Sequence, residues 1–283
     1  QLMLKAAGQG EKRAQYRVGM MYSFGRGTAK NPSEAVRWYL KSANQGYVDA
    51  EFSIGLCYAT GSGVEKDFDV AVDWYRKAAE KGHAEARRRL GLCYECGDGV
   101  AKSYAEAVKW YRKAIEAGDD LALGFLGDMY EFGKGVEKDL GKARELYKKC
   151  VEKGCDKPKE WLKRVENKIF TAEAIKAFDE KRWADGIAAA KKTDYSDSLL
   201  CDWMGYCYNN GYGVAKDQAE AFKWYTKAAE KNSSWSMNEL GRCYENGWSV
   251  TANREIAIAW YRKAAKLGQK DAKENLKRMG VSE

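Results

Sequence analysis

Residues 90–100, LGLCYECGDGV, combine two patterns whose residue types could do chemistry. Cys93 and Cys96 form a C-x-x-C pair, which is the spacing of a redox dithiol or of half a zinc site. Gly97 and Gly99 form a G-x-G, a pattern found in loops that hold phosphate groups. Whether these residues form an active site or serve the fold depends on the elements that position them.

The sequence around Cys93 and Cys96 suits neither redox chemistry nor zinc binding. A redox dithiol lies at a helix N-terminus, where the helix dipole lowers the thiol pKa, whereas Cys93 and Cys96 fall where a helix is predicted to end. A zinc site would need a second C-x-x-C or several histidines, and His83 is the only histidine in the chain. We therefore predict that Cys93 is a small core residue, that His83 lies in an ordinary turn, and that the chain binds no metal and no cofactor.

The composition favours a helical protein that does not cross a membrane. The chain has 283 residues, only two prolines, and no apolar run that approaches the length of a membrane span. Its 49 basic and 41 acidic residues give a net charge of +8. This mixed pattern is typical of solvated helices and does not predict a dedicated nucleic-acid-binding patch.

Three sequence features recur along the chain with a period of 36 residues: a leading glycine, a pair that ends in tyrosine, and the G-x-G. The leading glycine of the motif stands at Gly19, Gly55, Gly91, Gly127, Gly205 and Gly241. A Trp-Tyr or Leu-Tyr pair follows, ending at Tyr39, Tyr75, Tyr111, Tyr147, Tyr225 and Tyr261. The G-x-G itself recurs in five repeats, which is not expected of a single catalytic loop. We therefore predict that the G-x-G is a turn between helices.

Each repeat is predicted to form two helices. Ala50, Ile54 and Tyr58 fall on one face of the first helix of the second repeat. The G-x-G ends this helix, because glycine readily adopts the left-handed conformation of a helix end. The second helix of each repeat starts at a good N-cap residue, namely Asn31, Asp67, Ser103, Asp139, Asp217 and Asn253. The Trp-Tyr pair on this second helix is predicted to pack between helices.

The combined pattern, LG-x-C-Y-x-x-G-x-G-V-x-K-D followed by A-x-x-W-Y-x-K-A-A-x-x-G, resembles that of the Sel1-like repeat family, which is related to tetratricopeptide repeats. Six units carry the pattern and cover most of the chain. The resemblance implies an all-α fold, a right-handed α/α superhelix or solenoid of helical hairpins. It also implies the role of an adaptor that binds other proteins.

One branch of this family carries a disulfide in each repeat, between cysteines eight residues apart. In this chain the partner position for Cys150 is Pro158, so regular disulfides are not expected. Cysteines that are mostly unpaired core residues favour a reducing compartment, and hence the cytoplasm.

The repeat pattern breaks after the fourth full unit. Residues 157–196 have neither the G-x-G nor the Trp-Tyr pair, and they resemble a plain tetratricopeptide hairpin with a turn near Asp179–Arg182. We predict that 1–156 hold the second helix of a truncated unit and four repeats, and that the atypical hairpin follows. Two repeats and a capping helix then fill 197–283, all in one continuous solenoid. A domain boundary at the atypical hairpin is the alternative.

Function in a solenoid usually resides where the repeats differ. By analogy with tetratricopeptide repeats, the side of each first helix opposite Ile54 is expected to line a concave groove. The candidate peptide-binding residues on this side are Tyr16, Met20, Phe24, Phe52, Leu56, Arg88, Phe132, Tyr206, Asn209, Asn210, Trp235, Asn238 and Arg242. Aromatic side chains supply binding energy, and asparagine side chains can hydrogen-bond the backbone of an extended peptide.

The leading hypothesis is a non-enzymatic scaffold, expected to be a monomer, that binds a protein or peptide segment in the groove. RNA binding is one alternative, which acidic groove residues such as Glu95 and Glu245 disfavour. A hydrolase that uses Asp128 and Glu131, one helical turn apart, is another alternative. Carboxylate pairs of this kind are common on solvated helices, and no pattern of acid, base and nucleophile accompanies this one.

Overall fold

The computed structural model describes residues 2–155 and 158–282, and every regular element in these two stretches is a helix. Residues 1 and 283, and residues 156–157 at the predicted start of the atypical hairpin, lie outside the described residues. The all-α fold predicted from the sequence is confirmed. None of the helices so described is both long and apolar enough to span a membrane. The chain divides into two compact units, Gln1–Val165 and Glu166–Glu283.

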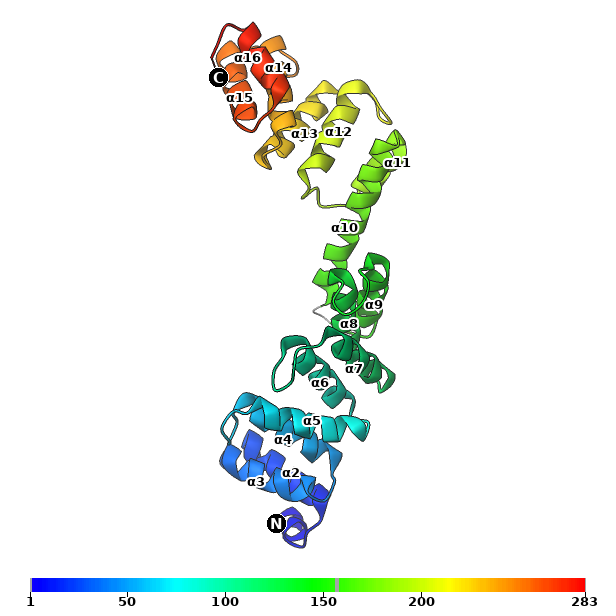
Figure 1. Cartoon of the computed structure of the whole chain (residues 1–283), viewed down its shortest axis with the longest axis vertical. Helices are drawn as coiled ribbons and strands as arrows, with labels where there is room; N and C mark the ends of the chain where they lie inside the picture. Colours follow the sequence, from blue (N-terminus) through cyan, green and yellow to red (C-terminus); the bar gives the residue numbers. More distant parts are fainter. Residues whose placement is uncertain (1, 156–157, 283) are drawn as a thin grey trace. The chain divides into compact units, whose positions relative to one another are not determined.

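The first unit is built from successive helical hairpins (Figure 1). It contains α1 (Leu2–Gly8), α2 (Lys12–Phe24), α3 (Pro32–Ala43), α4 (Val48–Thr60), α5 (Phe68–Glu80), α6 (Ala84–Cys96), α7 (Tyr104–Glu116), α8 (Leu121–Phe132), α9 (Leu140–Glu152) and the start of α10 (Pro158–Asp179). Consecutive helices from α1 to α9 contact one another. The pairs α2/α3, α4/α5, α6/α7 and α8/α9 are the two-helix repeats that the sequence predicts.

The second unit continues with the same kind of hairpin. After the end of α10 it contains α11 (Trp183–Ala190), α12 (Ser198–Asn210), α13 (Gln218–Glu230), α14 (Ser234–Asn246), α15 (Arg254–Lys266) and α16 (Lys270–Arg278). Consecutive helices from α11 to α16 contact one another. The pairs α12/α13 and α14/α15 are two further repeats. Helix α16 packs on the last of them through the buried side chains of Ala272 and Leu276.

The predicted N-cap residues begin the second helix of every repeat. In α3, the Asn31 side chain accepts a hydrogen bond from the Glu34 backbone N–H at 3.1 Å. Equivalent caps begin α5, α7, α9, α13 and α15 at the other predicted residues. The backbone N–H of the cap also bonds back to the first helix, as from Asp67 to the Tyr58 carbonyl. The start of the second helix is therefore fixed by bonds to both helices.

The leading glycine and the tyrosine of each repeat touch one another. A Cβ atom on Gly55 would lie only 2.6 Å from a ring carbon of Tyr75, which is buried. The same close approach joins Gly19 to Tyr39, Gly91 to Tyr111, Gly127 to Tyr147, Gly205 to Tyr225, and Gly241 to Tyr261. Because the glycine has no side chain, the tyrosine ring fills the space between the two helices of the hairpin. This contact explains why both marks recur with the same spacing.

The two glycines of the G-x-G have different roles. The first ends the helix in the left-handed conformation, as Gly61 does with a φ of 73°. The second lets the loop touch the preceding repeat, because a Cβ atom on Gly63 would lie 2.3 Å from the Pro32 carbonyl oxygen. The G-x-G is thus a turn and a contact between repeats, which confirms its predicted structural role.

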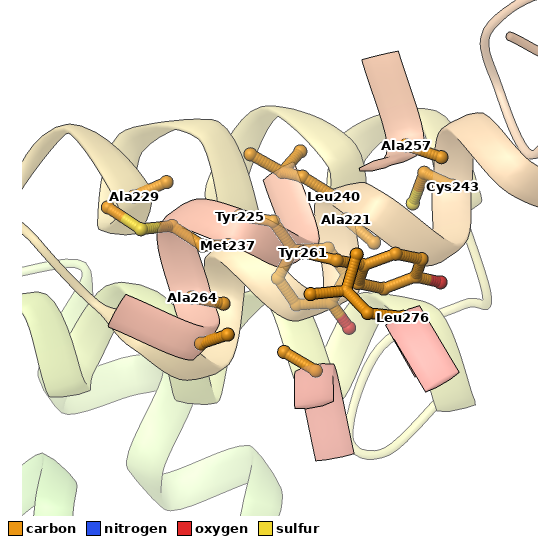
Figure 2. Packing of buried hydrophobic residues seen from close by; sticks show 12 residues of the cluster. Ala221, Tyr225, Ala229, Met237, Leu240, Cys243, Ala257, Tyr261, Ala264 and Leu276 are labelled. Atoms are coloured by element: carbon orange, nitrogen blue, oxygen red, sulfur yellow. The ribbon is translucent and has the colours of Figure 1, made fainter. Parts of the chain in front are cut away.

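Buried side chains from consecutive helices form the core. Figure 2 shows this packing in the second unit, where Tyr225, Leu240, Tyr261 and Leu276 belong to one cluster. These four side chains come from α13, α14, α15 and α16 in turn. The core therefore continues from one hairpin to the next, as expected of stacked repeats.

The atypical hairpin, formed by α10 and α11, reverses the order of the glycine and the aromatic residue. Phe178 lies on the first helix and Gly186 on the second, and a Cβ atom on Gly186 would lie 2.5 Å from the Phe178 ring. The helices meet at the turn predicted near Asp179–Arg182, where Lys181 has a φ of 58°. The hairpin thus keeps the close helix contact of the repeats without their sequence signature. Its place in one continuous solenoid stays a prediction.

Candidate functional site

The cysteines of residues 90–100 are protonated thiols. Cys93 is buried, and this burial raises its pKa to about 11. Cys96 is exposed at the end of α6, where partial burial and the Asp98 carboxylate raise its pKa as well. Redox chemistry proceeds through the thiolate, which the raised pKa disfavours in both residues. The predicted core role of Cys93 is confirmed. The part of the chain that the structure describes contains no group of His, Cys, Asp and Glu side chains that could hold a metal ion.

Phe52 and His83 contact each other in the first unit. The two rings stack with their centroids 4.4 Å apart, and Phe52 is only 8% exposed. His83 also begins α6, because its Nδ1 accepts the Ala86 backbone N–H at 3.1 Å. Burial lowers the pKa of this histidine, which favours the neutral ring that the cap requires. The histidine predicted in an ordinary turn is therefore a helix cap, and it covers a predicted groove residue.

Arg88, a second groove candidate of the first unit, is also buried. Its guanidinium binds the carboxylate of Asp119 at 2.8 Å and that of Glu85 at 3.1 Å. These contacts hold the side chain within the repeat stack. A partner could therefore reach neither Arg88 nor Phe52 without displacing such contacts.

The remaining candidates of the first unit are more accessible. Tyr16, Met20 and Leu56 are half-buried against two hydrophobic clusters. Phe24 and Phe132 are exposed, and they lie in different repeats. The Arg26 guanidinium lies over the ring of Phe24, and the Lys134 ammonium lies over the ring of Phe132.

The carboxylates of Asp128 and Glu131 are held by neighbouring side chains. The Tyr147 hydroxyl oxygen lies 2.6 Å from an oxygen of Asp128 and 2.9 Å from one of Glu131, so its single proton is shared between the two acceptors. The Arg164 guanidinium lies 3.6 Å from the first carboxylate and 2.6 Å from the second. Both groups thus serve the contact between the fourth repeat and α10.

A cavity of about 700 Å³ lies in the second unit. It is formed by the end of α10, the start of α11, α12, the loop after α12, and the start of α14. Its apolar lining residues are Phe178, Trp183, Leu199, Trp203, Tyr206, Tyr212 and Trp235. Its charged lining residues are Asp179, Lys181 and Asp202. This size and lining are typical of sites that bind a small molecule or a protruding side chain.

The aromatic rings of the cavity form one connected cluster. Trp183 stacks on Tyr212 with ring centroids 4.9 Å apart and an interplanar angle of 16°. Trp203 lies 5.9 Å from Trp183 and 5.8 Å from Tyr206. Tyr206 in turn lies 6.3 Å from Trp235. Contacts at these distances are favourable, so the rings hold one another in place.

The G-x-G after α12 brings Tyr212 to Trp183. Tyr212 is the middle residue of this motif, between Gly211 and Gly213. A Cβ atom on Gly213 would lie 2.8 Å from the Ala184 backbone nitrogen, so the loop rests against the start of α11. The contact that joins neighbouring repeats therefore also builds one wall of the cavity.

Asp202 is the half-buried carboxylate of the cavity. It accepts hydrogen bonds from the Ser233 hydroxyl at 2.8 Å and from the Ser236 hydroxyl. Burial raises the pKa of this carboxyl, the two hydroxyls lower it, and the nearby Asp197 raises it further. Its bonded neighbours are thus neutral hydroxyls.

Two predicted groove residues, Tyr206 and Trp235, lie together in this cavity. The asparagines near them have partners within the protein. Asn238 is buried and accepts a hydrogen bond from the Asn275 side chain at 3.1 Å, and Asn210 donates to the backbone carbonyl of Tyr206. The structure thus brings the predicted aromatic residues together but gives these two asparagines structural roles.

The last two candidates, Asn209 and Arg242, lie outside the cavity lining. The Arg242 guanidinium pairs with the Glu239 carboxylate at 3.0 Å.

Sequence reasoning missed Trp183, Trp203 and Tyr212. Trp203 occupies the position held by Ser53 in the second repeat, so its departure from the repeat pattern was a usable signal. Trp183 lies in the atypical hairpin, where no repeat column assigns it a face. Tyr212 lies inside a turn motif, whose sequence pattern indicates only a turn.

Comparisons with known proteins agree with this fold. The Sel1 repeat model matches residues 12–47, 48–83, 84–119, 121–155, 201–233 and 236–269. A search of curated proteins gives no match.

Two solved structures are similar to the chain. One is a protective antigen of uropathogenic Escherichia coli that displays an SLR fold, with 34% identity over 97% of this chain and 58% of that one, and a TM-score of 0.55. The other is a Sel1 repeat protein from Oxalobacter formigenes, with 31% identity over 93% of this chain and 87% of that one, and a TM-score of 0.50. The chain thus spans 58% of the length of the first of these proteins. With six matched repeats, the chain belongs to the Sel1 repeat family.

Proposed function

We propose that this protein is a non-enzymatic scaffold that anchors a protein or peptide segment in the aromatic cavity of the second unit. Sel1 and tetratricopeptide-like repeats generally mediate protein–protein interaction. The observation that carries the proposal is the cavity itself, in which Tyr206 and Trp235 from two repeats meet Trp183 of the atypical hairpin. Clustered aromatic residues in a partly enclosed site are typical of binding hot spots.

The rim of the cavity exposes large apolar side chains that a partner could contact. Leu199 is 46% exposed and Tyr212 is 39% exposed, and both belong to the lining. Large apolar side chains gathered at the mouth of a cavity favour contact with another molecule over contact with water. A segment that runs across α12 and α14 could place one side chain in the cavity while its flanks cover this rim.

RNA binding and hydrolysis receive less support. On the second helices, lysine ammonium groups lie over the tryptophan rings, as Lys77 does over Trp74 at 4.1 Å. A ring face covered by a side-chain cation is not open to stack on a base. The carboxylates of Asp128 and Glu131 are occupied by Tyr147 and Arg164.

The test is selection of peptides by the full chain from a random display library, followed by affinity measurement on variants. Leu199→Ala combined with Tyr212→Ala removes two exposed lining side chains, so the fold should remain intact. We expect the selected peptides to lose at least about tenfold in affinity, as hot-spot truncation typically costs 2 kcal/mol or more.

The matched control is Phe24→Ala combined with Leu121→Ala, which removes similar exposed apolar area from the first unit. This control should bind the selected peptides like the native chain. If the control loses binding and the cavity variant keeps it, the binding surface lies in the first unit and the assignment is wrong.

A further inference from the structure

Most of the buried and half-buried carboxylates on the first helices, or in the turn just before one, have a cationic partner. These pairs are Glu51 with Lys81, Asp119 with Arg88, Glu95 with Lys134, Glu131 with Arg164, Glu239 with Arg242, and Glu245 with Arg278. Asp202 differs from all of them. Among the residues that the structure describes, its hydrogen-bond partners are the Ser233 and Ser236 hydroxyls, and no Lys or Arg forms an ion pair with it.

A half-buried carboxylate without a cation is costly, because burial removes water that would otherwise solvate the charge. Two serine hydroxyls solvate Asp202 in part but carry no charge. Asp197, the other charged group that acts on it, repels it further. The position therefore favours a positive charge that the chain itself does not supply.

The ring faces of the cavity show the same pattern. Elsewhere in the second unit, Lys227 lies over the rings of Tyr195 and Trp224, and Lys263 lies over that of Trp260. Within the described stretches, no Lys or Arg lies over the rings of Trp183, Trp203, Tyr206, Tyr212 or Trp235. Aromatic faces attract cations, and this attraction grows where water is excluded.

We propose that the cavity takes a basic side chain, the guanidinium of an arginine or the ammonium of a lysine, from the bound protein segment. This inference rests on the proposed function and specifies its anchor. The alkyl part of the side chain would contact Trp183, Tyr206 and Trp235, while its charge lies near Asp202 and Asp179. An arginine or lysine has both the apolar stem and the terminal charge that such a lining fits.

Among the described residues that line the cavity, Lys181 is the one that carries a positive charge. It belongs to the exposed turn between α10 and α11, so its flexible side chain can keep its charge in water. The two carboxylates and one ammonium of the lining leave an excess of negative charge.

The probe is a capped peptide, acetyl-Gly-Ser-X-Ser-Gly-amide, in which X is arginine, lysine, citrulline or norleucine. Citrulline keeps the shape of arginine without its charge, and norleucine keeps the apolar stem of lysine. Binding to the full chain is followed by NMR through the indole N–H signals of Trp183, Trp203 and Trp235. We expect the arginine and lysine peptides to shift these signals with at least about tenfold higher affinity than the neutral peptides, as for charge-assisted contacts.

The outcomes distinguish a failure of the inference alone from a failure of the proposed function. If the norleucine peptide binds as tightly as the basic ones, the cavity takes an apolar side chain, so the inference is wrong while peptide binding is supported. If no peptide shifts the three signals, the cavity does not anchor peptides, and both proposals are wrong.

Asp202→Asn tests the carboxylate directly. This variant should bind the arginine peptide with about tenfold lower affinity and the norleucine peptide with unchanged affinity. The reason is that the asparagine amide keeps the shape of the carboxylate but not its charge. Asp185→Asn is the matched control, since this exposed carboxylate lies outside the lining and pairs with Arg182. An equal loss in both variants would show a general charge effect and overturn the role of Asp202.

Discussion

The charge of Asp202 links the cavity to the stability of the second unit. Burial raises the pKa of this carboxyl above its ordinary value of 3.8, so the folded chain binds the proton more tightly than the unfolded chain does. The contribution of this group to the free energy of unfolding therefore falls as the pH rises from the unfolded-state pKa through the folded-state pKa. Ionisation of this carboxyl in the folded protein places a partly desolvated negative charge in the cavity.

We predict that Asp202→Asn is more stable than the native chain at about pH 7, and that this advantage disappears toward about pH 3. The asparagine oxygen can still accept a serine hydrogen bond, and it has no charge to desolvate. Urea unfolding of both chains across this pH range measures the difference. An advantage that does not change with pH would contradict the argument.

For single residues, the sequence predicts a place in the binding site only where equivalent positions of several repeats can be compared. Tyr206 and Trp235 were predicted because they occupy variable positions of a first helix. Phe52 occupies such a position too, but its exposure depends on His83, which covers it from the start of the next helix. Such a contact involves a single pair of side chains, so no repeated sequence pattern reveals it.

The close contact between the helices of each hairpin depends on a missing side chain. We predict that Gly205→Ala lowers the free energy of unfolding by about 1–3 kcal/mol, because overpacking a core has this cost. The new Cβ atom would lie 2.4 Å from the ring of Tyr225, which is buried. Chemical denaturation of the purified variant measures the loss.

The matched control for this substitution is Gly8→Ala. An added Cβ atom on Gly8 would meet nothing within 4 Å, so the variant should be as stable as the native chain or slightly more stable. If Gly205→Ala also proved as stable as the native chain, the tyrosine ring could move aside, and the contact would not set the helix spacing.

The elements themselves were largely predictable from the sequence, because their signals are local. A cap such as Asn31 acts on the backbone three residues away, and a turn glycine such as Gly61 acts on its own φ angle. The contact between Gly55 and Tyr75 spans two helices, yet six copies of the spacing made it visible. The reversed contact of Phe178 with Gly186 occurs once, so periodicity could not reveal it.

In a stack of hairpins, each unit is stabilised mainly by its neighbours. We predict that Leu276→Ala lowers the stability of the end of the second unit by about 2–5 kcal/mol, since this side chain is fully buried. The loss of hydrogen-exchange protection should be largest in α15 and α16 and should decrease toward α12. Uniform loss over the second unit would instead indicate that it unfolds as one block.

Ile256→Ala provides the comparison for this experiment. Ile256 lies on α15, the helix on which α16 packs, and is 38% exposed, so its truncation should change stability by no more than about 0.5 kcal/mol. The two variants together separate loss of buried contacts from a general effect of shortening a side chain.

The reversed contact in the atypical hairpin affects how such proteins are found from their sequences. The segments matched by the Sel1 model stop at residue 155 and resume at residue 201, and the hairpin of α10 and α11 fills the interval. A sequence pattern that requires the glycine on the first helix and the aromatic residue on the second does not match this hairpin. Gaps in other repeat arrays could be searched for an aromatic residue that precedes a glycine by eight positions, as Phe178 precedes Gly186. Each hit would mark an interruption in the alignment that is still a paired helix in the protein.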